Sequence, residues 1–229
     1  MKPTNLLVNP LLTDLYQLTM AYAYWQSNRH NDEAVFELFF RKNPFKGEYT
    51  IFCGLDEVLK HVASFKFTDS DIAYIKSIPA FANCDPDFFE EYLAKLDCSK
   101  LKIYSLDQGR TAFPRIPLLI VVAPLGLGQL LETALLTLIN YPSLVATNAA
   151  RMVVAARCYN QSHLDEPMFG VRSSMHSSWR ADNDFAIDED RPRITLAEFG
   201  LRRAQGPDGG KIDKRKIYLH YCIYLVQLS

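Results

Sequence analysis

The stretch from Gln129 to Arg157 constrains the fold more than any other part of the chain. Its first half places leucines on one face at helical spacing, at Leu131, Leu135 and Leu138. A proline inside a helical pattern removes one backbone hydrogen bond, so we expect Pro142 to kink or restart the helix. The second half is rich in alanine, and small side chains let a neighbouring element approach closely. This stretch is therefore expected to be the helical axis against which other elements pack.

The residues before this stretch alternate between helical and strand-like patterns. Helical periodicity covers residues 11–29, 54–64 and 68–78, and a further helix is expected to begin at Asp85-Pro86. Thr68 and Asp71 have the spacing of a capping box at a helix N-terminus. Strand-like runs cover 34–40, 49–53 and parts of 101–122. The order indicates an α/β or α+β fold.

Two segments on either side of the long helical stretch interrupt regular structure. Gly126 and Gly128 stand at its start, and each glycine weakens a helix by roughly 1 kcal/mol, so we expect a shortened helix. The segment 158–193 is polar and acidic, so it is predicted to be a long surface loop. A strand-like run follows at 194–199.

The composition excludes several classes of protein. The hydrophobic share is 48%, which is enough for a core, and the net charge of −1 argues against a nucleic-acid binder. No secretory signal and no uninterrupted apolar run of about 18 residues is present, so we expect no membrane span. The five cysteines are scattered without a Cys-x-x-Cys pair, which predicts a reduced, cytoplasmic protein without structural zinc.

A candidate anion site lies at residues 198–210. It combines Arg202 and Arg203 with a glycine-rich turn over 206–210. The arginine fork matches carboxylate and phosphate oxygens two at a time, and glycines let the backbone approach a ligand closely. Two other interpretations remain open, a solvated pair and a structural ion pair with Glu198. The turn lacks the Lys-Ser/Thr of a phosphate-binding P-loop, so that type of nucleotide site is rejected.

Six segments together resemble nicotinate phosphoribosyltransferases, in the order found in that family. They are LTDLYQLTM (12–20), FELFFRKNP (36–44), CGLDEVL (53–59), FPRIP with QLLET (113–117 and 129–133), SLVATNAAR (143–151) and EFGLRRAQGPDGG (198–210). The resemblance implies the transfer of a phosphoribosyl group from 5-phosphoribosyl 1-diphosphate to nicotinate, the first step of NAD synthesis from nicotinate. It also implies ATP hydrolysis, Mg²⁺ and a homodimer.

The same resemblance implies a domain organisation. An N-terminal α/β domain is expected over 1–125, followed over 126–210 by the first part of the irregular α/β barrel of type II phosphoribosyltransferases, with the 158–193 loop inside it. The tail over 211–229 is basic and then apolar, and it does not resemble the family. At about 12 residues its apolar part is too short to span a membrane.

The resemblance assigns three substrate-binding residues. Arg202 and Arg203 are similar to the family's pair that contacts the phosphorylated substrate and nicotinate, and Tyr16 to its ring-stacking tyrosine, supplied across the dimer. Without the resemblance, a half-buried aromatic residue of an amphipathic helix is the favoured interpretation of Tyr16, and the motif makes the two interpretations equal. No catalytic residue is assigned. The spacing of His163 and His176 is not that of metal ligands, so no metal site is assigned.

Because members of the family are much longer, the chain is expected to be a C-terminally truncated member with an incomplete barrel and no activity alone. Two alternatives remain open. One is a non-catalytic isoform that associates with full-length subunits, and the other is a product that does not accumulate because unpaired strand edges and apolar surface favour aggregation.

Overall fold

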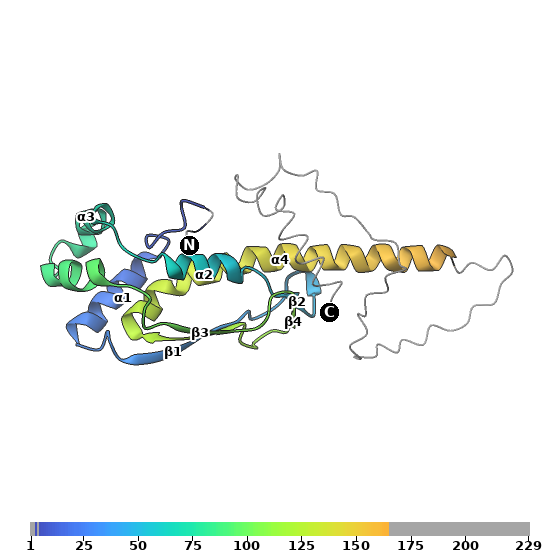
Figure 1. Cartoon of the computed structure of the whole chain (residues 1–229), viewed down its shortest axis with the longest axis horizontal. Coiled ribbons are helices and arrows are strands. Elements are labelled where there is room, and N and C mark those ends of the chain that lie inside the picture. The colour runs from blue at the N-terminus through green and yellow to red at the C-terminus, as the bar shows by residue number, and fades with distance from the viewer. Residues whose placement is uncertain (1–2, 4, 165–229) are drawn as a thin grey trace.

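The structure is a computed structural model that describes residues 3 and 5–164. Its α-helices are α1 (Leu15–Gln26), α2 (Leu55–Ala63), α3 (Asp69–Ser77) and α4 (Leu125–Leu164). Its strands are β1 (Glu33–Leu38), β2 (Thr50–Ile51), β3 (Lys102–Ser105), β4 (Thr111–Ala112) and β5 (Leu119–Pro124). Figure 1 shows α4 running along the long axis, with the other labelled elements gathered around its N-terminal half.

An antiparallel three-stranded sheet, in the order β1-β5-β3, forms one layer. Alternate residues of β5 point into the core, so Leu119, Val121 and Ala123 are buried. The core lies between this face of the sheet and the helices, and its large buried side chains include Phe88, Leu93, Leu127, Leu130 and Leu131. A smaller sheet pairs β2 with β4 further along α4 (Figure 1).

The first helix is shorter than its hydrophobic pattern over 11–29 predicted. It begins after Asp14, which forms a capping box with Gln17. At the other end Asn28 adopts a positive φ of 55°, and the N–H of Arg29 donates to the Tyr24 carbonyl at 2.8 Å. This arrangement is a Schellman motif, which satisfies the last carbonyls of a helix and ends it.

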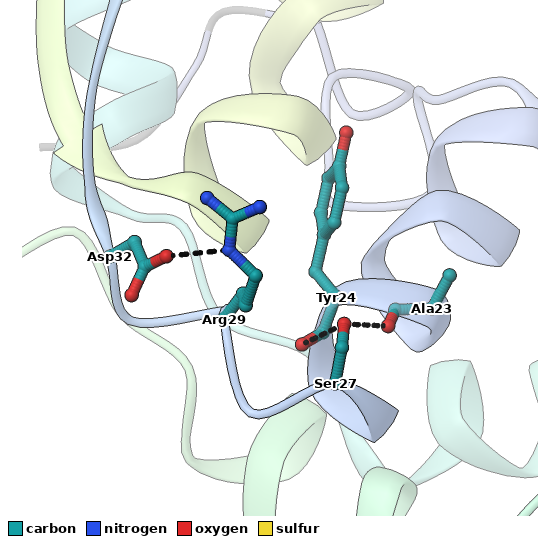
Figure 2. Close-up of polar contacts among 5 residues, drawn as sticks. All are labelled: Ala23, Tyr24, Ser27, Arg29 and Asp32. Carbon is teal, nitrogen blue, oxygen red and sulfur yellow. Dashed lines mark hydrogen bonds and ion pairs between the residues drawn. The ribbon is translucent and has the colours of Figure 1, made fainter.

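Two side chains reinforce this helix end, as Figure 2 shows. The Ser27 hydroxyl donates to the Ala23 carbonyl at 2.6 Å, and Arg29 pairs with Asp32 at 2.9 Å. The chain therefore leaves α1 in a fixed direction and enters β1 six residues after the cap.

The long helix α4 is continuous over 40 residues, so the expected shortening at its start is wrong. A Cβ on Gly126 would lie 2.2 Å from the Tyr92 hydroxyl, and one on Gly128 would lie 2.2 Å from the Phe36 ring. Both glycines therefore allow α4 to pack closely against aromatic side chains. This close packing outweighs the intrinsic cost of glycine in a helix.

Pro142 lies inside α4, which neither stops nor restarts there. Proline has no N–H to donate to the carbonyl of Leu138, four residues earlier. Gly54 approaches this carbonyl so closely that a Cβ would lie 2.3 Å from its oxygen. Gly54 also has a φ of 108°, which side-chain-bearing residues rarely adopt. The N-terminus of α2 thus packs directly on the helix backbone at the proline.

Beyond Pro142, hydroxyl side chains of α4 bond to the backbone around β2. The Ser143 hydroxyl accepts from the Cys53 N–H and donates to the Cys53 carbonyl, both at 3.0 Å. The Thr147 hydroxyl accepts from the Ile51 N–H at 2.9 Å. Ala146 and Ala150, on the same part of α4, pack against Ile51 and Cys53, as the small-residue pattern predicted. The helix therefore closes the edge of β2 that is not paired with β4.

The fold class is confirmed: helices and sheets are mixed, and the described residues form no closed barrel. The predicted loop over 158–193 is wrong at its start, because α4 continues to Leu164. The rest of that loop, the run at 194–199 and the tail over 211–229 lie outside the described residues. The domain boundaries stay a prediction.

The part of α4 from Leu125 to Ala155 is long and apolar enough to cross a membrane by length and composition. Half of the relevant window is buried inside the fold. A buried core helix passes the same test, so this observation does not indicate a membrane protein.

Candidate functional site

Tyr16 lies on the outer face of α1, where 45% of its surface is exposed. The opposite face of the helix buries Gln17, Leu18 and Ala21 against the rest of the protein. Met20, one turn after Tyr16, is exposed on the same face. The Tyr16 ring is therefore outside the hydrophobic core and accessible to a ligand or to another protein.

A buried glutamine fixes the first turn of α1 on α4. Gln17 is fully buried, and its side-chain amide donates to the Gln129 carbonyl at 2.5 Å. Its side-chain oxygen accepts from the Thr13 hydroxyl at 2.7 Å and from the Asp14 N–H at 2.9 Å. Because a buried amide is costly unless its hydrogen bonds are made, this arrangement sets the position of the residues that precede and follow Gln17.

Two further hydrogen bonds organise the side chains around Tyr16. The Thr133 hydroxyl donates to the Asp14 carboxylate at 2.7 Å, which joins α4 to the start of α1. The Gln129 side-chain amide donates to the Glu132 carboxylate at 2.8 Å. Two carboxylates, one from each helix, are thereby held beside the tyrosine. We call these five residues, Asp14, Tyr16, Gln129, Glu132 and Thr133, the tyrosine seam.

These surroundings shift the pKa of the Tyr16 phenol. Partial burial raises its pKa above the ordinary value, and so do a hydrogen bond to the Glu132 carboxylate and the negative charges of Glu132 and Asp14. A hydrogen bond with Thr133 acts in the opposite direction. The phenol is therefore protonated at neutral pH, and part of its ring is exposed.

The other predicted site residues, Arg202 and Arg203, lie outside the described residues. Nothing in the structure therefore tests whether they meet Tyr16. Within residues 3 and 5–164, no group of three or more histidine, cysteine, aspartate or glutamate side chains is arranged to hold a metal ion.

Sequence reasoning predicted a role for Tyr16, which stays a prediction, and it did not name the residues that surround Tyr16. Gln129, Glu132 and Thr133 belong to a segment of the family resemblance, and Asp14 and Gln17 belong to another, so both segments were noticed. The signal for a capping box was present at Asp14 and Gln17. The pairing of the two segments is a tertiary contact, for which helical periodicity offers no signal.

Comparison with known proteins agrees with the resemblance. A family model described as the N-terminal domain of nicotinate phosphoribosyltransferase matches residues 11–140, which include α1 and the part of α4 that forms the tyrosine seam. The fold is therefore that of the N-terminal domain of a phosphoribosyltransferase. The chain belongs to the nicotinate phosphoribosyltransferase family, which is a family of enzymes.

Individual relatives support this assignment. The chain is 46% identical over 213 residues to nicotinate phosphoribosyltransferase of Caenorhabditis elegans, and 43% identical over 220 residues to nicotinate phosphoribosyltransferase 2 of Arabidopsis thaliana. These matches cover 93% and 95% of this chain. In each case they cover 32% of the relative, so the chain spans about a third of the length of the curated relatives it matches.

The fold also matches a solved structure. The crystal structure of human nicotinic acid phosphoribosyltransferase aligns with a TM-score of 0.69 and 40% sequence identity. The alignment covers 92% of this chain and 34% of the human protein.

Proposed function

We propose that this chain is part of a nicotinate phosphoribosyltransferase that joins nicotinate to 5-phosphoribosyl 1-diphosphate. The products are nicotinate mononucleotide and diphosphate, and the reaction is the first step of NAD synthesis from nicotinate. The observation that carries the proposal is the family match over residues 11–140, which includes α1 and the part of α4 that forms the tyrosine seam. The exposed ring of Tyr16 agrees with a role in binding a planar aromatic ring.

In the proposed reaction the nicotinate ring nitrogen forms a bond to the anomeric carbon, and diphosphate leaves with the electron pair of the broken bond. Both substrates are anions, so arginines suit the task of holding them in place. We assign this role to Arg202 and Arg203. We assign Tyr16 to stacking on the pyridine ring, a contact of about 0.5–1.5 kcal/mol.

We include ATP hydrolysis and Mg²⁺ in the proposal on the basis of the family resemblance. The described part of the chain has no cluster of carboxylates and histidines that fits a metal ion. We therefore assign no described residue to ATP or Mg²⁺ and derive no step through them. A cytoplasmic location is proposed as well, on the basis of the scattered cysteines.

For the 229-residue chain by itself we propose that no nicotinate mononucleotide forms. The reason is that about two thirds of the length of its relatives has no counterpart in it. We further propose that the active form is a homodimer, to which one subunit lends Tyr16. A second candidate function is a non-catalytic partner that associates with full-length subunits, and the outward-facing Tyr16 and Met20 favour it.

The experiment that tests the proposal replaces the matching segment of the full-length Caenorhabditis elegans enzyme with residues 11–140 of this chain. We expect the chimera to form radiolabelled nicotinate mononucleotide from nicotinate, phosphoribosyl diphosphate, ATP and Mg²⁺. Tyr16→Ala in the chimera should weaken nicotinate binding by about 2- to 10-fold, the equivalent of one stacking contact. A folded but inactive chimera would contradict the proposed function.

The 229-residue chain is assayed beside the chimera. We expect no turnover, and robust turnover would show that the chain alone is an enzyme. A pull-down with the full-length enzyme tests the second candidate. Failure to associate at micromolar concentrations would reject it.

A further inference from the structure

Strand β5 is apolar on both of its faces. All six of its residues, Leu119–Pro124, are apolar, whereas a strand with one face in water ordinarily alternates apolar and polar residues. Every second residue of β5 is buried in the core, so Ile120 and Val122 point to the opposite side of the sheet. A continuous apolar strand is typical of a sheet that is covered on both faces.

The neighbouring strands extend this apolar surface. The register pairs each of the two outward residues of β5 with one residue of β1 and one of β3, and residues paired in this way point to the same face. We call the surface that they form the outer sheet face, and its residues are Val35, Glu37, Lys102, Tyr104, Ile120 and Val122. In the described part of the chain this face is open to solvent, since 64% of Val35 and 59% of Tyr104 are exposed.

The outer sheet face is acidic along β1. Glu37 belongs to it, and Glu33 lies two residues before Val35, on the same side of the strand. Neither carboxylate takes part in an ion pair among the described residues. A segment that fits this face is therefore apolar and carries positive charge at one end.

We propose that residues 217–228 of the same chain cover the outer sheet face, with the basic run 211–216 beside Glu33 and Glu37. Residues 217–228 are apolar or aromatic at all but two positions. The run before them carries four basic side chains, Lys211, Lys214, Arg215 and Lys216. The segment thus supplies an apolar part for the centre of the face and opposite charge for its acidic border.

The size of the face favours a segment of the same chain over a second copy. Three strands of up to six residues, about 4.8 Å apart and rising about 3.4 Å per residue, have a footprint of roughly 300 Å². A stable interface between two proteins needs about 800 Å² per partner. A tethered segment acts at an effective concentration on the order of 1 mM, so a smaller contact suffices.

The chain is long enough to make this contact. The 40 residues of α4 span about 60 Å, and the sheet lies beside the N-terminal half of this helix (Figure 1). Residues 165–216 can reach up to about 170 Å, at about 3.3 Å per residue. Residues 217–228 can therefore return to the sheet from the far end of α4.

Hydroxyl-radical oxidation of the 229-residue chain, read by mass spectrometry of its peptides, tests the proposal. Tyr74 on α3 is the internal control, because it is exposed to the same extent as Tyr104, 59%. We expect Tyr104 to be oxidised at least about 2-fold more slowly than Tyr74, because a tethered segment covers it for more than half of the time. Equal rates for the two tyrosines overturn the proposal.

A substitution in the segment gives the second measurement. Ile223→Asp places a charge in the middle of the apolar run, so Tyr104 should be oxidised as fast as Tyr74. Ser229→Asp adds the same charge outside the run and should leave both rates unchanged. Tyr92, which is 9% exposed in the core, should stay protected in both variants, which shows that the fold is intact. If Ile223→Asp leaves the rate of Tyr104 unchanged, the proposal is overturned.

Carbodiimide cross-linking identifies the occupant, because it joins carboxylates to lysine amines that are in contact. We expect peptides with Glu33 or Glu37 to be linked to peptides from 211–216. In a mixture of ¹⁴N-labelled and ¹⁵N-labelled chains, the two halves of each linked pair should carry the same label. Linked pairs with mixed labels would show that a second copy covers the face, and that result overturns the proposal, as does the absence of these links.

Discussion

Two places at which polar side chains of helix α4 bond to other elements differ in burial. Near β2, Ser143 and Thr147 are buried, and they bond to the backbone of a strand edge. At the tyrosine seam, Glu132 and Tyr16 are exposed, and the bonds there end on side chains. Buried polar groups that satisfy a backbone stabilise the fold, whereas exposed ones cost little to change.

The junction between β2 and α2 should give the largest effect. Gly54→Ala forces a side chain into a φ of 108° and places a Cβ 2.3 Å from the Leu138 carbonyl oxygen. Since neither the strand nor α4 can yield without breaking other contacts, we expect a loss of about 3 kcal/mol or more in the free energy of unfolding. Urea denaturation followed by circular dichroism measures it.

Gly47→Ala is the matched control for this prediction. A Cβ there would meet the guanidinium of Arg151, which is the end of a flexible side chain, and Gly47 has an ordinary φ of −67°. We expect a change below about 1 kcal/mol. Equal losses for both variants would show that close approach to α4 is not what Gly54 provides.

His61 tests whether burial alone makes a polar group important for stability. It is 1% exposed, its Nε2 has no hydrogen-bond partner, and burial lowers its pKa to about 4. The imidazole of His61 is therefore neutral in the folded chain at neutral pH. Stability from this group is complete above the unfolded pKa of about 6.5 and falls as the pH drops toward 4, by up to about 3 kcal/mol.

The measurement is the free energy of unfolding as a function of pH between 7 and 4. His61→Phe removes the titrating group and retains a ring beside Phe65, against which His61 packs edge to face. The free energy of unfolding of the variant should fall less steeply between pH 7 and 4 than that of the wild type. If the free energies of unfolding of the variant and the wild type depend on pH in the same way, His61 can take up a proton in the folded chain without loss of stability.

Ser143→Ala measures the buried bonds near β2 directly. The substitution leaves the N–H and carbonyl of Cys53 without the hydroxyl that bonds to both. Losing hydrogen bonds to buried backbone groups costs about 1–3 kcal/mol, which should appear as a lower midpoint of urea unfolding. Ser105→Ala, which removes an exposed hydroxyl from β3, is expected to change stability by less than about 0.5 kcal/mol.

Local patterns predicted much of the fold. The capping box at Thr68 and Asp71 is present, and Phe88, Phe89, Tyr92 and Leu93 are buried as their spacing predicted. These features depend on residues close in the sequence, where propensity and periodicity act.

The errors have a common physical cause. Gly126 and Gly128 lie in a helix because Tyr92 and Phe36 pack against them, and these aromatic residues are distant in the sequence. A motif predicted a role for Tyr16, but the bond between Thr133 and Asp14 beside it joins two segments distant in the sequence, and no local pattern predicts that bond. Tertiary contacts, which local patterns do not predict, thus explain both the wrong prediction for the start of α4 and the residues missed around Tyr16.

The smallest change in stability is expected at the tyrosine seam. Glu132→Gln keeps the shape of the side chain and one acceptor, and its position is exposed, so the free energy of unfolding should change by less than about 0.5 kcal/mol. Gln17→Ala is the contrast, because it removes a buried amide and leaves the Gln129 carbonyl without that donor, at a cost of about 1–3 kcal/mol. If Glu132→Gln destabilises the chain as much as Gln17→Ala does, the exposed seam stabilises the fold as much as the buried amide beside it, and the distinction between exposed and buried polar groups is wrong.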